Sequence, residues 1–292
     1  MWLTIASLRY PADQEVDLVD MVCTHLNLSP DKIKDIRIIR KSLDARKIKI
    51  FWVVSLEMNV EGISRAEAKN ILSCRGVSLS APRPTGTTAQ PVRKGGGKVV
   101  IAGCGPAGIF AALTLVKRGV KPLILERGSE IEKRVSDVEK YWKDGLLNEE
   151  SNVQFGEGGA GTFSDGKLTT RIKDERKNQV LQALVKAGAP EEITYLNRPH
   201  LGSDQLLSVV KGLRERLRQS GVEIRFNAKV IDLIVEKGRL RGVETSDGMM
   251  DTENLFLAIG HSSRDTYEML HGKGVAMTPK AFAVGLRIEH PQ

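Results

Sequence analysis

Alternating apolar and polar residues mark the clearest strand pattern in the first 80 residues. Between Lys47 and Met58 every second residue is apolar, so one face of a strand would carry Ile48, Ile50, Trp52, Val54, Leu56 and Met58. Shorter β-rich runs predict further strands at 2–8, 33–41 and 77–80.

Two helices are predicted between these strands. One helix face is indicated by the three- and four-residue spacing of Leu18, Met21, Val22, His25 and Leu26. Ser64 and Glu67 form the capping sequence S-x-x-E, which predicts a helix that ends near Cys74. The resulting order βαββαβ is that of a ferredoxin-like α+β domain, predicted for residues 1–80.

A segment without apolar periodicity follows this region. Residues 81–97 read APRPTGTTAQPVRKGGG, which is typical of a linker. The chain of 292 residues is thus divided into a basic domain at 1–80, a linker at 81–97 and an α/β domain at 98–292.

A strand–turn–helix pattern opens the α/β domain. Val99–Ala102 is apolar, as expected of a buried strand, and G-x-G-x-x-G follows from Gly103 to Gly108 before an apolar helical segment. The next apolar run, at 122–125, ends at Glu126. This combination predicts a dinucleotide site in a Rossmann-like domain.

Each part of this motif has a physical role. Gly103 would allow a tight turn, Gly105 would let a pyrophosphate approach the backbone, and Gly108 would let helix and strand pack closely. The N–H groups at the helix start favour negative charge. Glu126 would accept hydrogen bonds from the adenosine ribose and repel a 2′-phosphate, which disfavours NADP at this site.

A second glycine-rich segment lies at 155–168, FGEGGAGTFSDGKL, with five glycines in fourteen residues. No regular element tolerates so many glycines, so we expect a loop whose backbone N–H groups crowd a ligand; the alternative is a flexible surface loop. Helices are expected at 175–186, at 203–219 and after His261. Strands are expected at 222–226, 229–235, 240–245 and 255–259.

Composition narrows the class of protein. Apolar residues make up 41% of the chain, which argues against disorder. The three cysteines, Cys23, Cys74 and Cys104, form no CxxC, which favours a reducing, cytoplasmic setting. The charge-free stretch 99–116 is broken by glycines and a proline. We therefore expect neither a membrane span nor membrane partners, and no secretory signal is visible.

The net charge of +8 raises the question of whether the chain binds nucleic acid. Eight basic side chains fall within residues 32–49, on the predicted central hairpin. However, the run Lys47–Trp52 lacks the glycine and the aromatic spacing of an RNA-recognition motif. A solvated or docked sheet face is therefore favoured over an RNA-binding one.

The motif GCGPAG, with Pro-Ala inside the glycines, resembles the start of the FAD-binding domain in glutathione-reductase-like flavoproteins. Together with residues 155–168 and LFLAIG at 255–260, it is similar to a bacterial family of FAD-dependent dehydrogenases, or NAD(P)/FAD-dependent oxidoreductases. That family also carries a basic domain ahead of its FAD domain. The resemblance covers 98–292 well and 1–80 more loosely.

The resemblance implies FAD as the cofactor and hydride transfer to or from flavin N5. It also implies a small-molecule substrate, with NAD(P)H left open as a partner; neither catalytic residues nor metal ligands can be assigned. Taken with the motif, it assigns to the cofactor Gly103, Gly105, Pro106, Ala107, Gly108, Glu126, Arg127, Glu157, Gly158, Gly159, Ala160, Gly161, Thr162, Val230 and Gly260.

Similar flavoproteins close the site with a late acidic segment. This chain ends at Gln292 within a strand-like run, so we expect the C-terminal part of the family pattern to be lacking. Two other functions stay open: an NAD-binding dehydrogenase that uses the glycine motif alone, and a non-catalytic nucleotide-binding module with an RNA-facing first domain.

Overall fold

The computed structural model describes residues 1–81, 97–170, 172–286, 288 and 290. Contacts divide the chain into two units: 1–92 with 160–220, and 93–159 with 221–292. Residues 160–220 therefore group with the N-terminal part, whereas the sequence predicted them within one domain at 98–292. The predicted linker at 81–97 lies outside the described residues except for its two ends.

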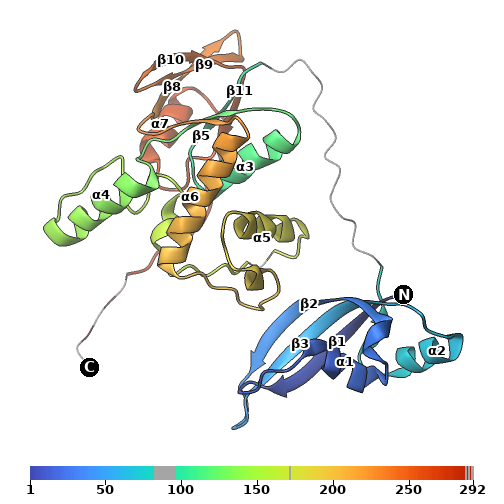
Figure 1. The fold of residues 1–292 in the computed structure, drawn as a ribbon. Coiled ribbons are helices and arrows are strands. Elements are labelled where there is room, and N and C mark those ends of the chain that lie inside the picture. The colour runs from blue at the N-terminus through green and yellow to red at the C-terminus, as the bar shows by residue number, and fades with distance from the viewer. Residues whose placement is uncertain (82–96, 171, 287, 289, 291–292) are drawn as a thin grey trace. The chain divides into compact units, whose positions relative to one another are not determined.

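An antiparallel sheet of four strands begins the first unit (Figure 1). Its strands, in the order β2-β3-β1-β4, are β1 (Trp2–Pro11), β2 (Ile33–Asp44), β3 (Phe51–Val60) and β4 (Val77–Leu79). Helix α1 (Leu18–Leu26) follows β1, and α2 (Arg65–Ser73) follows β3. The predicted order βαββαβ is thus observed, with a short 3-10 turn at Pro30–Lys32 before β2.

One face of this sheet packs against the two helices. Leu3, Ile5, Val22, Leu56, Met58 and Ile71 form the centre of this core and are fully or almost fully buried. Val54, Leu56 and Met58 share the face that alternation predicted. Ile48 is instead fully exposed, because β3 begins only at Phe51 and residues 45–50 form the hairpin loop.

The capping box of α2 is confirmed. The Ser64 hydroxyl accepts a hydrogen bond from the Glu67 N–H at 3.2 Å, and the Glu67 carboxylate accepts one from the Ser64 N–H at 2.8 Å. These bonds satisfy two N–H groups that the first turn of a helix leaves without intrahelical partners.

Residues 160–220 complete the first unit. Their elements are η2 (Ala160–Phe163), α5 (Arg176–Lys186), η3 (Glu191–Thr194) and α6 (Ser203–Gln219). The chain after η3 pairs with edge strand β2: the Lys41 N–H donates to the Tyr195 carbonyl at 2.8 Å, and the Asn197 N–H donates to the Lys41 carbonyl at 2.9 Å. This pairing covers part of an edge that would otherwise be open to other strands.

A parallel sheet is the centre of the second unit. In the order β11-β5-β6-β7 it contains β5 (Val99–Ala102), β6 (Leu123–Leu125), β7 (Glu223–Arg225) and β11 (Asn254–Leu257). Helices α3 (Pro106–Lys117), α4 (Ile131–Asp144) and α7 (Arg264–Gly272) follow β5, β6 and β11. An antiparallel sheet of β8 (Val230–Glu236), β9 (Arg239–Thr245) and β10 (Gly248–Asp251) lies between β7 and β11 in sequence.

The core of the second unit joins the two sheets. Val100 and Leu125 from the parallel sheet cluster with Leu233 and Val243 from the antiparallel one. The chain leaves β5 for β6 on one side and returns as β11 on the other. In open parallel sheets, ligands bind at the carboxyl ends of the strands where the order reverses in this way.

Most predicted elements of the second half are observed, with ends that differ by a few residues. Helix α4 and strand β10 were not predicted. The strand expected near the C-terminus is absent from the described residues there, and Leu286 is almost fully exposed.

The core of the first unit yields a stability prediction. We expect Leu56→Ala to lower the free energy of unfolding by about 2–5 kcal/mol, because the side chain is fully buried. The exposed Ile48→Ala should change it by less than about 0.5 kcal/mol. Urea unfolding followed by circular dichroism measures both, and equal effects would contradict the packing described for β3.

Candidate functional site

The ends of three parallel strands meet around Gly103. The Gly103 N–H donates to the Leu125 carbonyl at 2.7 Å, and the Ala258 N–H donates to the Ala102 carbonyl at 2.8 Å. Gly103 has φ +107°, and a Cβ there would lie 2.3 Å from the Ala258 carbonyl oxygen. Only glycine fits this position, which confirms the tight turn expected of the first glycine of the motif.

The other two glycines of the motif differ in what surrounds them. A Cβ on Gly108 would lie 2.0 Å from the Gly103 carbonyl oxygen, so this glycine is required for close packing of helix and strand. A Cβ on Gly105 would lie 3.6 Å from the Cα of Gly159, an ordinary contact. The packing of the protein itself therefore leaves room for a methyl group at Gly105.

Gly105 is the N-cap of α3, and Pro106 and Ala107 are its first residues. The N–H groups of the first helical turn have no intrahelical acceptors, and the helix dipole adds partial positive charge there. The space that Gly105 leaves at this point is thus suited to an anionic group.

Glu126 lies directly after β6 and is 4% exposed. One carboxylate oxygen accepts a hydrogen bond from the Cys104 N–H at 2.6 Å; the other accepts from the Gly128 N–H at 2.9 Å and the Gly156 N–H at 3.0 Å. Glu126 therefore joins three segments of the backbone. A carboxylate has about four acceptor positions, so a ribose hydroxyl could still be bound.

The glycine-rich segment uses its N–H groups within the protein. The N–H groups of Gly156, Glu157, Gly158 and Gly159 donate to the Glu126 carboxylate and to the carbonyls of Ser129, Cys104 and Gly156, respectively. The expectation that these groups crowd a ligand is therefore wrong for these four residues. Ala160, Gly161 and Thr162 belong to η2 in the first unit, where Thr162 is buried.

Arg127, next to Glu126, is held by protein groups. Its guanidinium donates to Glu150 at 2.6 Å and to both carboxylate oxygens of Asp265 at 3.0 Å, and it stacks on the Phe155 ring at 4.0 Å. Lys229 binds the same two acids. Partial burial alone would raise the pKa of Asp265, but hydrogen bonds from the two cations hold it well below its ordinary value.

Two other predicted residues lie in the second unit. Val230 begins β8 with its side chain in the core, and the nearby Ala228 N–H donates to the Glu126 carbonyl at 2.9 Å. Val230 is thus near the end of β6, and its assignment to the cofactor stays a prediction. Gly260 follows β11 with φ +73°, and its carbonyl accepts a hydrogen bond from the Tyr267 hydroxyl at 2.9 Å.

Sequence reasoning missed Arg134, which is fully buried on α4 and contacts the glycine-rich segment. A signal existed, because Ile131, Val135 and Val138 recur at helical spacing. That spacing would have predicted the helix but not the burial of an arginine within it.

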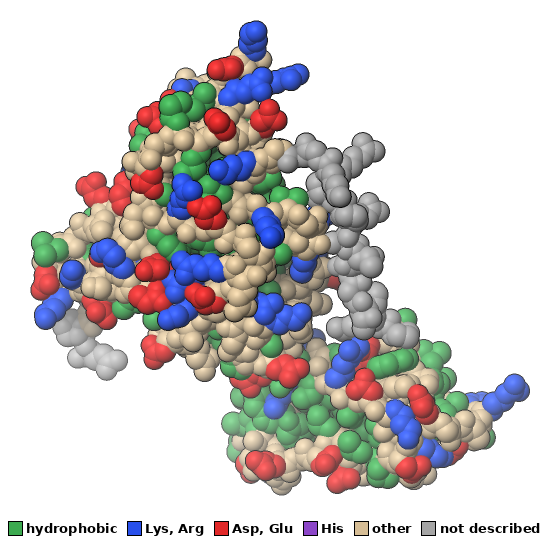
Figure 2. Space-filling view, turned by 45° about the horizontal axis from the view of Figure 1, so that its top comes forward, with side chains coloured by type: hydrophobic (Ala, Val, Ile, Leu, Met, Phe, Trp, Pro, Cys, Tyr) green, Lys and Arg blue, Asp and Glu red, His purple; other side chains and the backbone are tan. Residues whose placement is uncertain are grey.

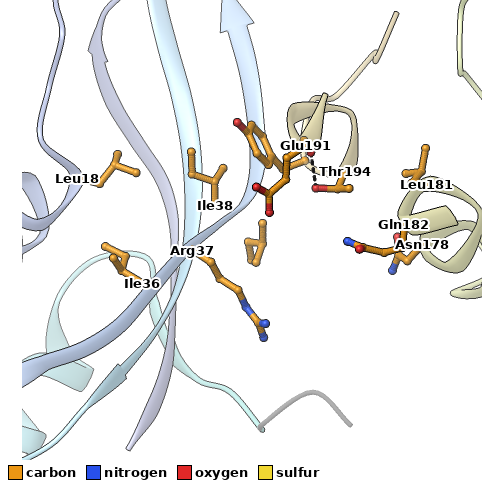
Figure 3. Close-up of a pocket in the computed structure, with 11 residues that line it drawn as sticks. Leu18, Ile36, Arg37, Ile38, Asn178, Leu181, Gln182, Glu191 and Thr194 are labelled. Carbon is orange, nitrogen blue, oxygen red and sulfur yellow. Dashed lines mark hydrogen bonds between the residues drawn. The ribbon is translucent and has the colours of Figure 1, made fainter. Parts of the chain in front are cut away.

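A cavity of about 440 Å³ lies in the first unit (Figure 3). Leu18, Ile36 and Ile38 lie on one side of it, and Asn178, Leu181 and Gln182 from α5 lie on the other. None of the predicted site residues lines it.

The basic stretch on the hairpin is partly neutralised. Lys32, Arg37 and Arg46 form ion pairs with Glu67, Glu57 and Asp44, respectively. On the face seen in Figure 2, basic and acidic side chains are interspersed over the surface. The expectation of a solvated or docked sheet face in place of an RNA-binding one stays a prediction.

The described residues contain no cluster of three or more His, Cys, Asp or Glu side chains arranged to hold a metal ion. No helix in the described part of the chain combines the length and the apolar character needed to cross a membrane.

The chain is similar to one domain family, to two known protein sequences and to several solved structures. Residues 3–59 match a domain of unknown function, DUF8436. An uncharacterized protein of Clostridium beijerinckii is 46% identical over 298 residues, which cover 100% of this chain and 55% of that protein. Digeranylgeranylglycerophospholipid reductase 1 of Methanococcoides burtonii is 30% identical over 148 residues, 50% of this chain and 32% of that protein.

The chain thus spans about half the length of the first of these relatives and about a third of the second. Among solved structures, glycine oxidase from Bacillus cereus is similar over 61% of this chain and 58% of that chain, with 17% identity and a TM-score of 0.40.

Gly108 and Gly105 should respond differently to substitution by alanine. We expect Gly108→Ala to lower the free energy of unfolding by about 1–3 kcal/mol, because its methyl group would overlap a backbone oxygen. Gly105→Ala should cost about 1 kcal/mol or less. It should nevertheless weaken the binding of ADP at least about tenfold, a loss of about 1.4 kcal/mol.

Urea unfolding and calorimetric titration with ADP measure these two effects. Gly119→Ala is the control, since a Cβ there meets nothing within 4 Å and the residue lies beyond the far end of α3. Its φ of +81° predicts a loss of stability without a loss of ADP affinity. Undiminished ADP binding by Gly105→Ala would contradict the anion site.

The ion pairs of Asp265 predict a pH dependence. Its pKa is lowered in the folded state, so its contribution to stability is present above the ordinary value of 3.8 and is lost as the pH falls below it. Asp265→Asn should therefore destabilise the protein more at pH 7 than at pH 3. Urea unfolding at both pH values tests this, with the exposed Asp251→Asn as control; a constant difference would contradict the ion pairing.

Proposed function

We propose that the chain is an FAD-dependent oxidoreductase whose cofactor lies at the carboxyl edge of the parallel sheet. The observation that carries this proposal is the environment of Gly105. The protein itself leaves room there for a side chain, yet the position is glycine, at a helix N-terminus and close to the strand end that carries Glu126. This arrangement suits a pyrophosphate that must approach the backbone.

The residues present fit the adenosine diphosphate half of FAD. Gly105 and the first turn of α3 would hold the pyrophosphate, and the Glu126 carboxylate would accept from the ribose. Arg127 and Val230 would border the adenine, and Glu157, Gly158, Gly159 and Gly260 would border the flavin. In this proposal the second unit is Rossmann-like and residues 1–80 are ferredoxin-like.

One observation supports FAD over NAD: the motif GCGPAG resembles that of FAD-binding proteins. The M. burtonii relative bears the name of a reductase, which supports an oxidoreductase activity. When bound, the flavin supplies hydride transfer at N5. The contribution of the chain would be to bind and orient the cofactor beside a small-molecule substrate, with NAD(P)H as a candidate electron partner.

The absorption spectrum of the purified chain tests this proposal. We expect flavin bands in the visible region, and FAD as the compound released on denaturation. Release of FMN or NAD would contradict the assignment of the glycine motif to FAD. A colourless protein that fails to bind added FAD but retains RNA in a salt-sensitive manner would favour the nucleotide-binding module instead.

A further inference from the structure

Arg134 binds the glycine-rich segment from inside the second unit. Its guanidinium donates four hydrogen bonds to backbone carbonyls: to Asn152 at 2.9 Å, Val153 at 3.1 Å, Glu157 at 2.5 Å and Gly159 at 3.0 Å. A single side chain thus ties both ends of residues 152–159 to the first turn of α4. The planar guanidinium, with donors in several directions, is suited to this role.

The charge of Arg134 is retained although the side chain is fully buried. Burial lowers its pKa to about 10, while the nearby carboxylates of Glu126 and Glu157 act in the opposite direction. The side chain is therefore protonated at neutral pH, and its bonds to the carbonyls are charge-assisted, which makes them stronger than neutral ones.

The backbone of the same segment is shaped around this side chain. A Cβ on Gly156 would lie 2.4 Å from Cδ of Arg134, so only glycine leaves room for the arginine. On its other side the segment donates from Gly156 to Glu126 and from Gly158 to the Cys104 carbonyl. Residues 156–159 are thus fixed between α4 and the turn that contains the glycine motif.

Gly159 is the residue that faces Gly105. A Cβ on Gly105 would come within 3.6 Å of its Cα, and the Gly159 carbonyl is one of the four acceptors of Arg134. The position of Arg134 therefore sets the distance between the glycine-rich segment and the N-terminus of α3, where the anionic group is expected to bind.

We propose that Arg134 is a positioning residue for the pyrophosphate of the cofactor. It holds Gly159 in place before the cofactor binds, so that the space in front of Gly105 has the correct width in the free protein. This inference rests on the proposed function. A pre-formed site avoids the entropic cost of ordering a glycine-rich segment during binding.

Arg134→Lys tests the proposal, because lysine keeps the charge but cannot span four carbonyls at once. Arg134→Met is the more disruptive substitution, because methionine is of similar length but has neither charge nor hydrogen-bond donors. Affinity is measured by titration of the full chain with FAD, ADP and adenosine, and stability by urea unfolding. Arg214→Lys is the matched control, a buried arginine on α6 in the first unit.

We expect Arg134→Lys to weaken FAD and ADP binding at least tenfold and adenosine binding much less, because only FAD and ADP carry the pyrophosphate. Amide hydrogen exchange at residues 156–159 should also rise in this variant. Arg214→Lys should leave the affinity for all three ligands unchanged, whatever it does to stability. If Arg134→Met does not fold, Arg134→Lys alone decides the question.

Three results would overturn the inference, and the third is distinguishable from the first two. If the parent chain binds FAD and ADP and Arg134→Lys binds them equally well, Arg134 serves only the stability of the fold. The same conclusion follows if all three ligands are weakened by the same factor. If the parent chain binds neither FAD nor ADP, the proposed function fails and this inference fails with it.

Discussion

The carboxylate of Glu126 joins three backbone segments that lie far apart in the sequence. It accepts hydrogen bonds from the turn after β5, from its own turn after β6 and from the glycine-rich segment before η2. A buried carboxylate is costly unless its oxygens are hydrogen-bonded, and glycine-rich loops lose much conformational entropy when they are ordered. The three N–H groups stabilise the buried carboxylate, and the carboxylate in turn holds the three loops in place. The geometry around Gly105 depends on these hydrogen bonds.

Local rules predicted much of this arrangement from the sequence. The strand, the tight turn at Gly103 and the close packing at Gly108 follow from the motif, because each depends on residues a few positions apart. The capping box of α2 and the buried face of β3 are local in the same sense. These features required no knowledge of where distant segments lie. Whether the motif holds FAD stays a prediction.

The features that sequence reasoning missed depend on contacts between distant segments. Five glycines in a short loop suggested free N–H groups, but the acceptors that use them lie on Glu126, Ser129 and Cys104. The helical pattern of α4 could have been recognised, whereas the burial of Arg134 becomes visible only once residues 152–159 surround it. Ile48 was predicted to lie on the apolar face of the strand, but it is exposed in the hairpin loop. The alternating pattern runs on into this loop and does not show where the strand begins.

The pairing of Lys41 with Tyr195 and Asn197 has a consequence for synthesis on the ribosome. Strand β2 is complete when residue 44 emerges, but the segment that binds its edge is made some 150 residues later, at about 5–20 residues per second. For about 8–30 seconds the nascent chain therefore carries an open strand edge, to which another chain could add. The interleaved order of the two units implies that the first cannot be completed until much of the second has been translated.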